Sequence, residues 1–364
     1  MTREIFVGLM SGTSLDGVDA VLADFGGAKP KLLANASVPF DAPLRRELLA
    51  LNSPGADEID RAARAGNELA RIYAAAVAEV LASAKTPKTQ VRAVGCHGQT
   101  VRHRPERGYT TQIGNAALLA ELTGICVVAD FRSRDVAAGG QGAPLVPAFH
   151  AMVFADPAED RVAINLGGIA NLSILPRHGS VTGFDSGPGN CLLDAWASTH
   201  LGTSHDDLGN WAAGGKLIPD LLERMLKEPY FATPSPKSTG RDLFNESWLR
   251  RHLTGDENAQ SVQATLLELT ARSVADAVAR HCREARRLIV CGGGGKNDAL
   301  MRRLAQIAAP AALESSERHG IDPQFVEAAA FAWLAKQAVD GEPGNLPSVT
   351  GARAARVLGA IYPA

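Results

Sequence analysis

The chain has 364 residues, of which 46% are hydrophobic and 21% are charged, and its formal net charge is −2. This length and composition favour a globular protein of two domains or one two-lobed unit, and they exclude a disordered chain. The near-neutral charge argues against a nucleic-acid partner, and the lack of a long apolar run argues against a membrane protein.

The first part of the chain alternates short apolar runs with two helical patterns. Alanine and leucine recur every three or four residues over 57–84, which predicts a long helix, and a shorter helix is expected over 43–52. Strands are predicted at residues 4–8, 18–25, 31–38, 91–96, 109–113 and 125–129. A loop rich in glycine and proline follows at 139–147.

Near residue 160 the opening pattern starts again. Strands are predicted at 162–166, 172–175 and 181–184, and a helix begins near Asn190. The order strand, glycine turn, strand, strand, helix repeats that of the N-terminus, so we predict a structural duplication. The two lobes would comprise residues 1–160 and 161–364, with two phosphate-facing turns opposite each other across a cleft.

The rest of the chain continues the alternation. Helices are predicted over 261–283, 296–308 and 322–339, the last capped by Asp322, with a short buried strand at 288–291. Residues 230–240 contain two prolines, follow Pro229, and predict a mobile loop. Alternating strands and helices predict an α/β protein with mixed sheets.

The stretch GLMSGTSLDGVD at 8–19 joins two apolar strands through small and hydroxylated residues. Glycines at positions 8, 12 and 17 allow a close backbone approach and positive φ. Ser11, Thr13 and Ser14 add hydroxyl groups. Such a turn is suited to cradle phosphate oxygens, and the alternative is an ordinary tight hairpin.

A second glycine-rich stretch, GGGG at 292–295, follows a predicted strand and precedes a helix. Backbone without side chains can lie flat against a planar group such as adenine, and the alternative is a turn that packs a helix. The stretch lacks the spacing of a dinucleotide-binding loop. It is not a Walker loop either, because Asn rather than Ser or Thr follows Lys296.

Asp185, in the stretch GFDSGPGN at 183–190, comes directly after an apolar strand and beside a glycine turn. A carboxylate in that place is suited to act as a general base. The alternatives are that it holds a metal-bound water, or that it caps a helix or turn.

Two further segments carry polar side chains. Asp130, Arg132, Arg134 and Asp135 lie beside a flexible glycine segment, where arginines suit carboxylate or hydroxyl-rich ligands and aspartates suit sugar hydroxyls. A surface ion-pair network is the alternative. The stretch CHGQTVRH at 96–103 supplies hydrogen-bonding groups, of which His97 is also interpretable as a core histidine. Its spacing is poor evidence for zinc.

Taken together, these stretches resemble the anhydro-N-acetylmuramic acid kinases, a family of the acetate and sugar kinase, heat-shock protein and actin superfamily. The matching blocks follow the order of that family along almost the whole chain: GLMSGTSLDGVDA (8–20), GCHGQTVRH (95–103), DFRSRDVAAGGQGAPLVP (130–147), INLGGIANLS (164–173), GFDSGPGNCLLDAW (183–196), STGRDLFNESWL (238–249), CGGGGKND (291–298) and GIDPQFVEAAAFAWLA (320–335).

The resemblance implies a two-lobed, duplicated ribonuclease-H-like fold, as in actin and sugar kinases, with a central nucleotide cleft. It implies ATP-dependent phosphorylation of 1,6-anhydro-N-acetylmuramic acid coupled to hydrolytic opening of its anhydro bridge. The product would be N-acetylmuramic acid 6-phosphate, in the recycling of cell-wall peptidoglycan. Most relatives in the superfamily carry an aspartate before the first glycine turn, where this chain reads MSGTS.

The resemblance and the motifs together give the expected site. Asp185 matches the general base of the family, and Glu327 matches a carboxylate that contacts the sugar. The ATP-binding residues are expected to be Gly12, Thr13, Ser14, Leu15, Asp16, Gly17, Val18, Asp19, Gly167, Gly168, Asn171, Gly292, Gly293, Gly294 and Lys296. The residues expected at the amino sugar are His97, Gln99, Asp130, Arg132, Asp135 and Glu327. Asp16 and Asp19 are the candidate ligands for Mg²⁺.

Three other functions are weighed against this one: a plain sugar or carboxylic-acid kinase of the same fold, a nucleotide-switched interaction protein, and a metallohydrolase built on His97 and His103. We expect a small-molecule substrate and a homodimer. Five cysteines without a Cys-x-x-Cys pair, and an N-terminus without a signal-peptide pattern, predict a cytoplasmic location.

Overall fold

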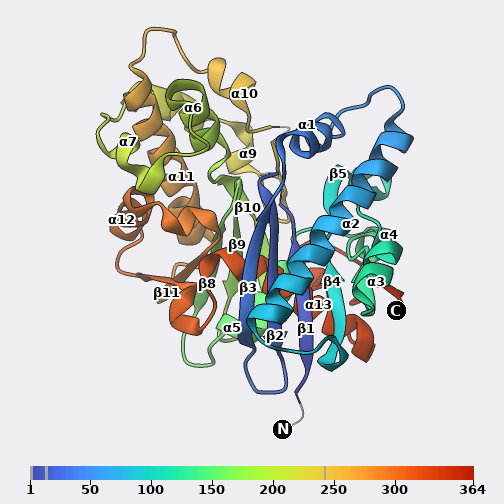
Figure 1. Cartoon of the computed structure of the whole chain (residues 1–364). Helices are drawn as coiled ribbons and strands as arrows, with labels where there is room; N and C mark the ends of the chain where they lie inside the picture. The colour runs from blue at the N-terminus through green and yellow to red at the C-terminus, as the bar shows by residue number, and fades with distance from the viewer. Residues whose placement is uncertain (1–2, 13–14, 242) are drawn as a thin grey trace. The chain divides into compact units, whose positions relative to one another are not determined.

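The structure is a computed structural model that describes residues 3–12, 15–241 and 243–364 (Figure 1). The chain divides into two compact units, the first made of Met1–Val153 and Gln324–Ala364, the second of Phe154–Pro323. The C-terminal residues, assigned to the second lobe by the sequence prediction, therefore belong to the first unit. The reason is helix α13 (Val326–Asp340), which packs on the sheet of that unit.

The first unit is built on a mixed sheet of six strands in the order β13-β7-β4-β1-β2-β3. Strands β1, β2 and β3 are antiparallel neighbours, β4 is parallel to β1, and β7 is parallel to β4. The strands are β1 (Ile5–Met10), β2 (Gly17–Asp24), β3 (Lys31–Pro39), β4 (Val91–Cys96), β7 (Val127–Ala129) and β13 (Ala360–Tyr362). A separate hairpin joins β5 (Gln99–Arg104) to β6 (Tyr109–Ile113).

The helices that accompany this sheet are α1 (Ala42–Ala50), α2 (Glu58–Ser83), α3 (Ala116–Thr123), α4 (Ser133–Ala137), α5 (Val146–Phe154, where the units divide), α13 and α14 (Pro347–Thr350). Helix α2 is amphipathic: Leu69, Tyr73, Val77 and Val80 recur at helical spacing and are buried. This face lies against β2 and β3, so α2 covers the antiparallel part of the sheet.

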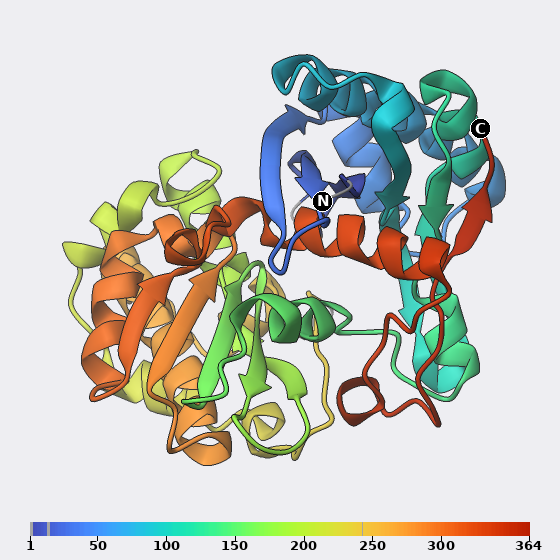
Figure 2. The ribbon, with the colours of Figure 1, turned by 90° about the horizontal axis from the view of Figure 1, so that it is seen from below.

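Helix α13 contacts β1, β2 and β4 and crosses the sheet of the first unit (Figure 2). Two glycines permit the approach. A Cβ atom on Gly8 would lie 1.9 Å from the carbonyl oxygen of Ala328, and one on Gly95 would lie 2.0 Å from that of Phe331. The backbone of the helix therefore rests directly on β1 and β4. Because the φ of Gly8 is not positive, the close contact with α13, and not the backbone conformation, is what requires glycine at this position.

The second unit is built on a mixed sheet of five strands in the order β10-β9-β8-β11-β12. Its strands are β8 (Arg161–Leu166), β9 (Ile169–Leu175), β10 (Thr182–Pro188), β11 (Arg287–Cys291) and β12 (Ala312–Ser315). Three antiparallel strands are again followed by two parallel ones, and β8 takes the place of β1. The predicted duplication and the ribonuclease-H-like fold class are confirmed.

The helices of the second unit are α6 (Cys191–Leu201), α7 (Asn210–Ala213), α8 (Pro219–Leu226), α9 (Pro229–Ala232), α10 (Glu246–Arg250), α11 (Ala259–His281) and α12 (Asp298–Ile307). Helix α11 is the centre of the core, because it contacts β9 and β10 as well as α6, α7, α8 and α12. Its long buried surface explains why it is apolar on more than one side.

Most predicted elements lie within a few residues of the observed ones. Strands β5, β12 and β13 were not predicted, nor were helices α3, α4, α5, α7, α8, α9, α10 and α14. Helix α13 begins at Val326, so Asp322 does not cap it, and β10 continues to Pro188 instead of ending at residue 184. Pro188 is accommodated because β10 is an edge strand. Within the described residues, no helix combines the length and apolar character that a membrane crossing requires.

Candidate functional site

Two glycine loops of the second unit meet at one edge of its sheet. The Gly167–Gly168 turn follows β8, and the 292–296 loop follows the parallel neighbour β11. Gly292 has a φ of 82°, and a Cβ atom there would lie 2.4 Å from Oδ1 of Asn165. A Cβ atom on Gly294 would lie 2.7 Å from the Cβ atom of Leu166. The two loops can touch only because positions 292 and 294 have no side chains.

A third segment, at the start of α6, is fastened to the same turn. The backbone N–H of Asn190 donates to the carbonyl oxygen of Gly167 (2.8 Å), and that of Gly189 donates to Gly168 (3.0 Å). The side-chain Nδ2 of Asn190 also donates to the carbonyl oxygen of Leu166 (3.1 Å). Asn190 thus fixes the turn. The sequence predicted only that a helix begins near Asn190, because nothing in the sequence indicates this long-range contact.

The joined loops leave one stretch of backbone open. A Cβ atom on Gly293 would have no heavy atom within 4 Å, and Gly293 and Lys296 are both exposed. Exposed glycine backbone beside a lysine is suited to an anionic or planar ligand. The structure therefore brings together six of the seven residues of the second unit predicted to bind ATP, all except Asn171: Gly167, Gly168, Gly292, Gly293, Gly294 and Lys296.

A row of polar residues crosses the sheet beneath these loops. Asn165 on β8 is paired in register with Asn171 on β9, which is paired with Asp185 on β10. Directly opposed residues of antiparallel strands share a face of the sheet. Asn165 is 3% exposed, and its Oδ1 has no hydrogen-bond partner among the residues that the structure describes. A buried acceptor of this kind fits a site completed by a bound donor such as water or a ligand hydroxyl.

Asp185 lies inside β10 rather than just beyond it, next to an irregularity in the pairing with β9. One carboxylate oxygen, Oδ2, accepts a hydrogen bond from the backbone N–H of Thr239 (2.9 Å). The backbone N–H of Asp185 donates to the carbonyl oxygen of Lys237 (3.3 Å), and the hydroxyl of Tyr230 donates to the carbonyl oxygen of Asp185 (2.8 Å). The 230–240 segment, predicted as a mobile loop, therefore holds the candidate base.

The β1–β2 turn of the first unit is anchored from beneath. The Ser11 hydroxyl is 2.7 Å from the hydroxyl of Tyr73 on α2 and donates to the carbonyl oxygen of Gly98 (3.0 Å). Nε2 of Gln99 donates to the carbonyl oxygen of Gly12 (3.1 Å). Gln99, predicted to bind sugar, is 1% exposed and positions this turn. Thr13 and Ser14, both predicted to bind ATP, lie outside the described residues.

The rest of that turn differs from expectation in its backbone. Among the described residues of this turn, Leu15 has a positive φ (57°), whereas Gly17 does not. Gly17 is needed for close packing, since a Cβ atom there would lie 2.4 Å from the carbonyl oxygen of Val38. The side chains of Leu15 and Val18 are buried in the core of the unit. Only their backbone atoms are therefore suited to contact a ligand.

The two candidate magnesium ligands have different surroundings. Asp16 is exposed in the turn before β2. Asp19 lies on β2, where its Oδ1 accepts hydrogen bonds from the hydroxyl of Ser37 (2.5 Å) and from Nε2 of Gln324 (3.0 Å). No group of three or more His, Cys, Asp or Glu residues suited to a metal occurs in the described part of the chain. Mg²⁺ bound to a nucleotide needs only one or two carboxylates, so both aspartates stay candidates for this role.

A second set of predicted residues gathers beside α13 in the first unit. Nε2 of His97 lies 3.1 Å from Nε and 3.0 Å from Nη2 of Arg132, and the imidazole ring lies 4.7 Å from the ring of Phe331. Burial, and then the charge of Arg132, lower the pKa of His97 to about 3, so the ring is neutral and accepts from the arginine. Glu327 is four residues before Phe331 and therefore shares its helical face.

Asp130 and Asp135 do not join this set in the same way. Asp135 is fully buried, and its carboxylate accepts hydrogen bonds from Gly142 N–H (2.7 Å), Asn345 Nδ2 (2.6 Å) and the Thr350 hydroxyl (2.7 Å). These contacts favour a positioning role for Asp135 over a direct contact with sugar. Asp130 is exposed and, with Arg134, lines a shallow hollow at the end of β7.

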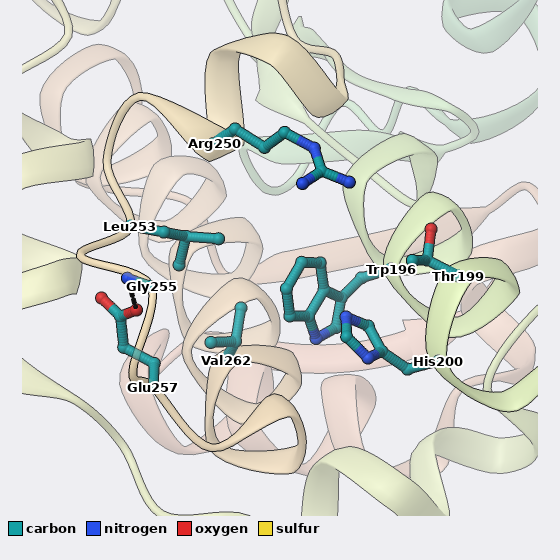
Figure 3. Close-up of a pocket in the computed structure, with 8 residues that line it drawn as sticks. All are labelled: Trp196, Thr199, His200, Arg250, Leu253, Gly255, Glu257 and Val262. Atoms are coloured by element: carbon teal, nitrogen blue, oxygen red, sulfur yellow. Dashed lines mark hydrogen bonds between the residues drawn. The ribbon is translucent and has the colours of Figure 1, made fainter.

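Another hollow lies in the second unit between α6, α10 and the start of α11 (Figure 3). It is lined by Trp196, Thr199, His200, Arg250, Leu253, Gly255, Glu257 and Val262. Its polar groups already have protein partners: Trp196 Nε1 donates to Ala259, and Glu257 accepts from the backbone N–H groups of Thr254 and Gly255. No residue predicted to bind ligand lines this hollow, so the glycine loops are the better candidate site.

Known proteins match this chain over its whole length. The family model described as anhydro-N-acetylmuramic acid kinase matches residues 4–364. A protein of that name from Nitrosospira multiformis is 53% identical over 366 residues, covering 100% of both chains. Those from Variovorax paradoxus and Cupriavidus metallidurans are each 56% identical, over 100% of this chain and 100% and 98% of theirs.

Proposed function

Because the chain belongs to the anhydro-N-acetylmuramic acid kinase family, we propose that it uses ATP and water to convert 1,6-anhydro-N-acetylmuramic acid into N-acetylmuramic acid 6-phosphate and ADP. This reaction recycles an amino sugar of the bacterial cell wall. The observation that carries the proposal is the pairing of Asp185, across Asn171, with Asn165 beneath the joined glycine loops of one sheet. That arrangement supports a single acid acting beside a bound nucleotide.

In the proposed reaction, Asp185 accepts a proton from water as the water oxygen bonds to the anomeric carbon. The bond between that carbon and O6 breaks, and O6 takes the γ-phosphoryl group of ATP. A second carboxylic acid is not required, because phosphorylation neutralises the developing charge on O6. Water activation by one carboxylate is the chemistry of inverting glycosidases, and phosphoryl transfer depends mainly on positioning.

For the nucleotide, the proposal assigns the open backbone at Gly293 and the exposed Lys296 to the ligand, with Gly167 and Gly168 at the phosphates. The β1–β2 turn of the first unit, from Gly12 to Asp19, is assigned the same role through its backbone. Mg²⁺ is part of this proposal: bound to ATP, it would neutralise phosphate charge. Asp16 and Asp19 are its candidate ligands.

For the sugar, the proposal assigns His97, which contacts Arg132 and the ring of Phe331, together with Arg132 and with Glu327, which lies on the same helical face as Phe331. A guanidinium fork suits a carboxylate or several hydroxyl groups. The five cysteines are all free thiols, which supports the proposed cytoplasmic location. We also propose a homodimer, which sedimentation of the purified chain would test.

The substitution Asp185→Asn tests the proposal. We expect it to abolish both opening of the anhydro bridge and ADP release while the protein stays folded. The exposed Asp220 of α8 gives the matched control, Asp220→Asn, which should keep full activity. In ¹⁸O-labelled water, the wild type should place label on the anomeric carbon. Opening at the normal rate by Asp185→Asn would contradict the role of the base, and phosphorylation without label would indicate a plain sugar kinase.

A further inference from the structure

A strap formed by residues 229–239 covers the free edge of β10. This strand lies at the end of the sheet of the second unit, where its outer backbone groups have no neighbouring strand. The strap begins with α9 (Pro229–Ala232) and supplies a carbonyl acceptor at Lys237 and an N–H donor at Thr239. Both contact Asp185, so the strap acts on the proposed base rather than on the strand in general.

Within the strap, Tyr230 and Lys237 contact each other. Nζ of Lys237 donates to the carbonyl oxygen of Tyr230 (3.0 Å) and lies 4.6 Å from the centre of its ring. The hydroxyl of Tyr230 in turn donates to the carbonyl oxygen of Asp185 (2.8 Å). Tyr230 and Lys237, near the two ends of the strap, therefore both contact the backbone of Asp185.

The strap also packs against the hydrophobic core of the second unit. Gly187 has a φ of 157°, and a Cβ atom there would lie 2.6 Å from the ring of Phe231. The ring of Phe231 lies 5.7 Å from that of Phe244, and Tyr230 lies 5.8 Å from the same ring. These contacts are local to β10 and α9. They explain why a segment rich in proline is held in one conformation.

Positive charge gathers around the strap. The charged and titratable groups near it include Lys237 on the strap, Arg280 and His281 at the end of α11, Tyr230 and Asp185. Burial and the nearby charge of Arg280 lower the pKa of Lys237, while Asp185 opposes this shift. Burial and then the charge of Asp185 raise the pKa of Tyr230, so this hydroxyl keeps its proton. Lys237, whose carbonyl oxygen accepts the hydrogen bond of the Asp185 N–H, is thus the cation of the strap that is next to the proposed base.

We propose that Lys237 and Tyr230 are positioning residues for Asp185: the tyrosine fixes the backbone of the base, and the lysine favours its charged form. This inference rests on the proposed function, because it concerns the step in which Asp185 takes a proton from water. A carboxylate held in one orientation by a backbone N–H, beside a fixed cation, stays ionised and aimed at lower pH than an isolated one.

The test compares Tyr230→Phe, Lys237→Met and Lys237→Arg by measuring kcat against pH with saturating ATP and anhydro sugar. Tyr230→Phe should lower kcat by about 10-fold to 100-fold and change each KM by less than about 2-fold. Lys237→Met should move the acid limb of the kcat profile to higher pH, by about 0.5 to 1 unit, and Lys237→Arg should restore it. The controls are Tyr109→Phe and Lys216→Met, which remove an exposed hydroxyl and an exposed charge elsewhere.

If the strap only stabilises the fold, the variants should give a different result. Lower unfolding temperatures with an unchanged acid limb in Lys237→Met, or an unchanged kcat in Tyr230→Phe, would overturn the inference. Should Lys237→Met fail to fold, the kcat of Tyr230→Phe decides the matter alone. The proposed function is tested separately, since it fails only when Asp185→Asn still opens the anhydro bridge.

Discussion

Gly293 provides a test that separates a ligand-binding loop from a turn that merely packs a helix. A side chain at position 292 or 294 would meet Asn165 or Leu166, whereas a Cβ atom at 293 would have no heavy atom within 4 Å. The φ of Gly293 is not positive, so alanine fits the backbone. We therefore predict that Gly293→Ala folds normally and binds ATP poorly.

The expected magnitudes follow from these distances. Where alanine fits the backbone of a glycine, it raises stability by about 0.4–1 kcal/mol through the unfolded chain. At position 294 the added atom would lie 2.7 Å from the Cβ atom of Leu166 and 2.9 Å from Oδ1 of Asn190. Gly294→Ala should accordingly cost about 1–3 kcal/mol. For Gly293→Ala, a methyl group in the proposed contact surface should weaken ATP binding by at least about tenfold, or about 1.4 kcal/mol.

Urea unfolding and calorimetric titration with ATP measure the two quantities independently. Gly27→Ala serves as the control. Gly27 lies in an exposed turn of the first unit, and the heavy atom nearest to its added Cβ atom would be 3.5 Å away. Gly293→Ala should then be as stable as the control and lose ATP affinity, whereas Gly294→Ala should be less stable. A Gly293→Ala protein that folds normally and binds ATP within about twofold of the wild type would refute the reasoning.

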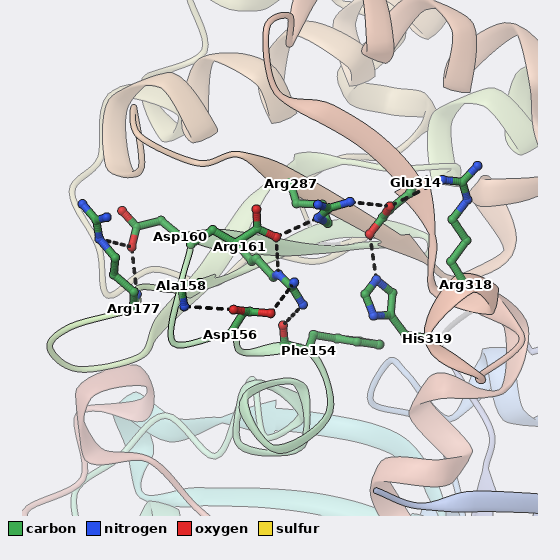
Figure 4. Close-up of polar contacts among 11 residues, drawn as sticks. Phe154, Asp156, Ala158, Asp160, Arg161, Arg177, Arg287, Glu314, Arg318 and His319 are labelled. Atoms are coloured by element: carbon green, nitrogen blue, oxygen red, sulfur yellow. Dashed lines mark hydrogen bonds and ion pairs between the residues drawn. The ribbon is translucent and has the colours of Figure 1, made fainter.

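Two further predictions concern stability. Gly95→Ala should destabilise the first unit by about 1–3 kcal/mol or more in urea unfolding, because its Cβ atom would lie 2.0 Å from a backbone oxygen of α13; equal stability would contradict the contact. In the second unit, Arg287 bridges Glu159 and the buried Glu314 (Figure 4), and Arg287→Gln should cost about 1–3 kcal/mol at pH 7. Hydrogen bonding to Arg287 lowers the pKa of Glu159. Burial raises the pKa of Glu314, but hydrogen bonds from His319 and Arg287 outweigh this effect, so its pKa is also lowered. The contribution of these ion pairs to stability is therefore present above the unfolded pKa of about 4.3 and is lost as the pH falls through the folded pKa. The difference between wild type and variant should therefore shrink in acid, and a constant difference would argue against the ion pairs.

Periodicity was sufficient to predict most of the fold. The 57–84 pattern corresponds to α2, and the restart near residue 160 corresponds to a second copy of the same strand order. Strand β5 was hidden because Val101 is its one apolar residue, so the segment shows no apolar alternation. The placement of 324–364 depends on Gly8 and Gly95, which accept a helix from a distant part of the chain. No local pattern encodes such a partner.

The candidate site shows the same limit. The glycine runs indicated where backbone is left open, and Asp185 stood out as a carboxylate near a strand end. What the sequence did not reveal were the residues that hold these groups: Asn190 on the Gly167 turn, and Tyr230 and Lys237 on Asp185. Each acts through hydrogen bonds between distant positions, and such bonds leave no periodicity to detect. The burial of Asp135 was not predicted either, since an aspartate in a polar stretch gives no sign of being buried.

The duplication explains how one topology can serve two ligands. The turn after the first strand of each sheet, at Gly12 in one unit and Gly167 in the other, keeps small residues and is anchored by a side-chain amide, from Gln99 and from Asn190. The loops after β4 and β11 occupy the same place in the strand order but have diverged in chemistry. One carries a buried, neutral His97 held by an arginine, and the other carries bare glycine backbone. The proposed function assigns the sugar to the first of these loops and the nucleotide to the second, so it predicts that the loop after the fourth strand distinguishes the ligands of the two units.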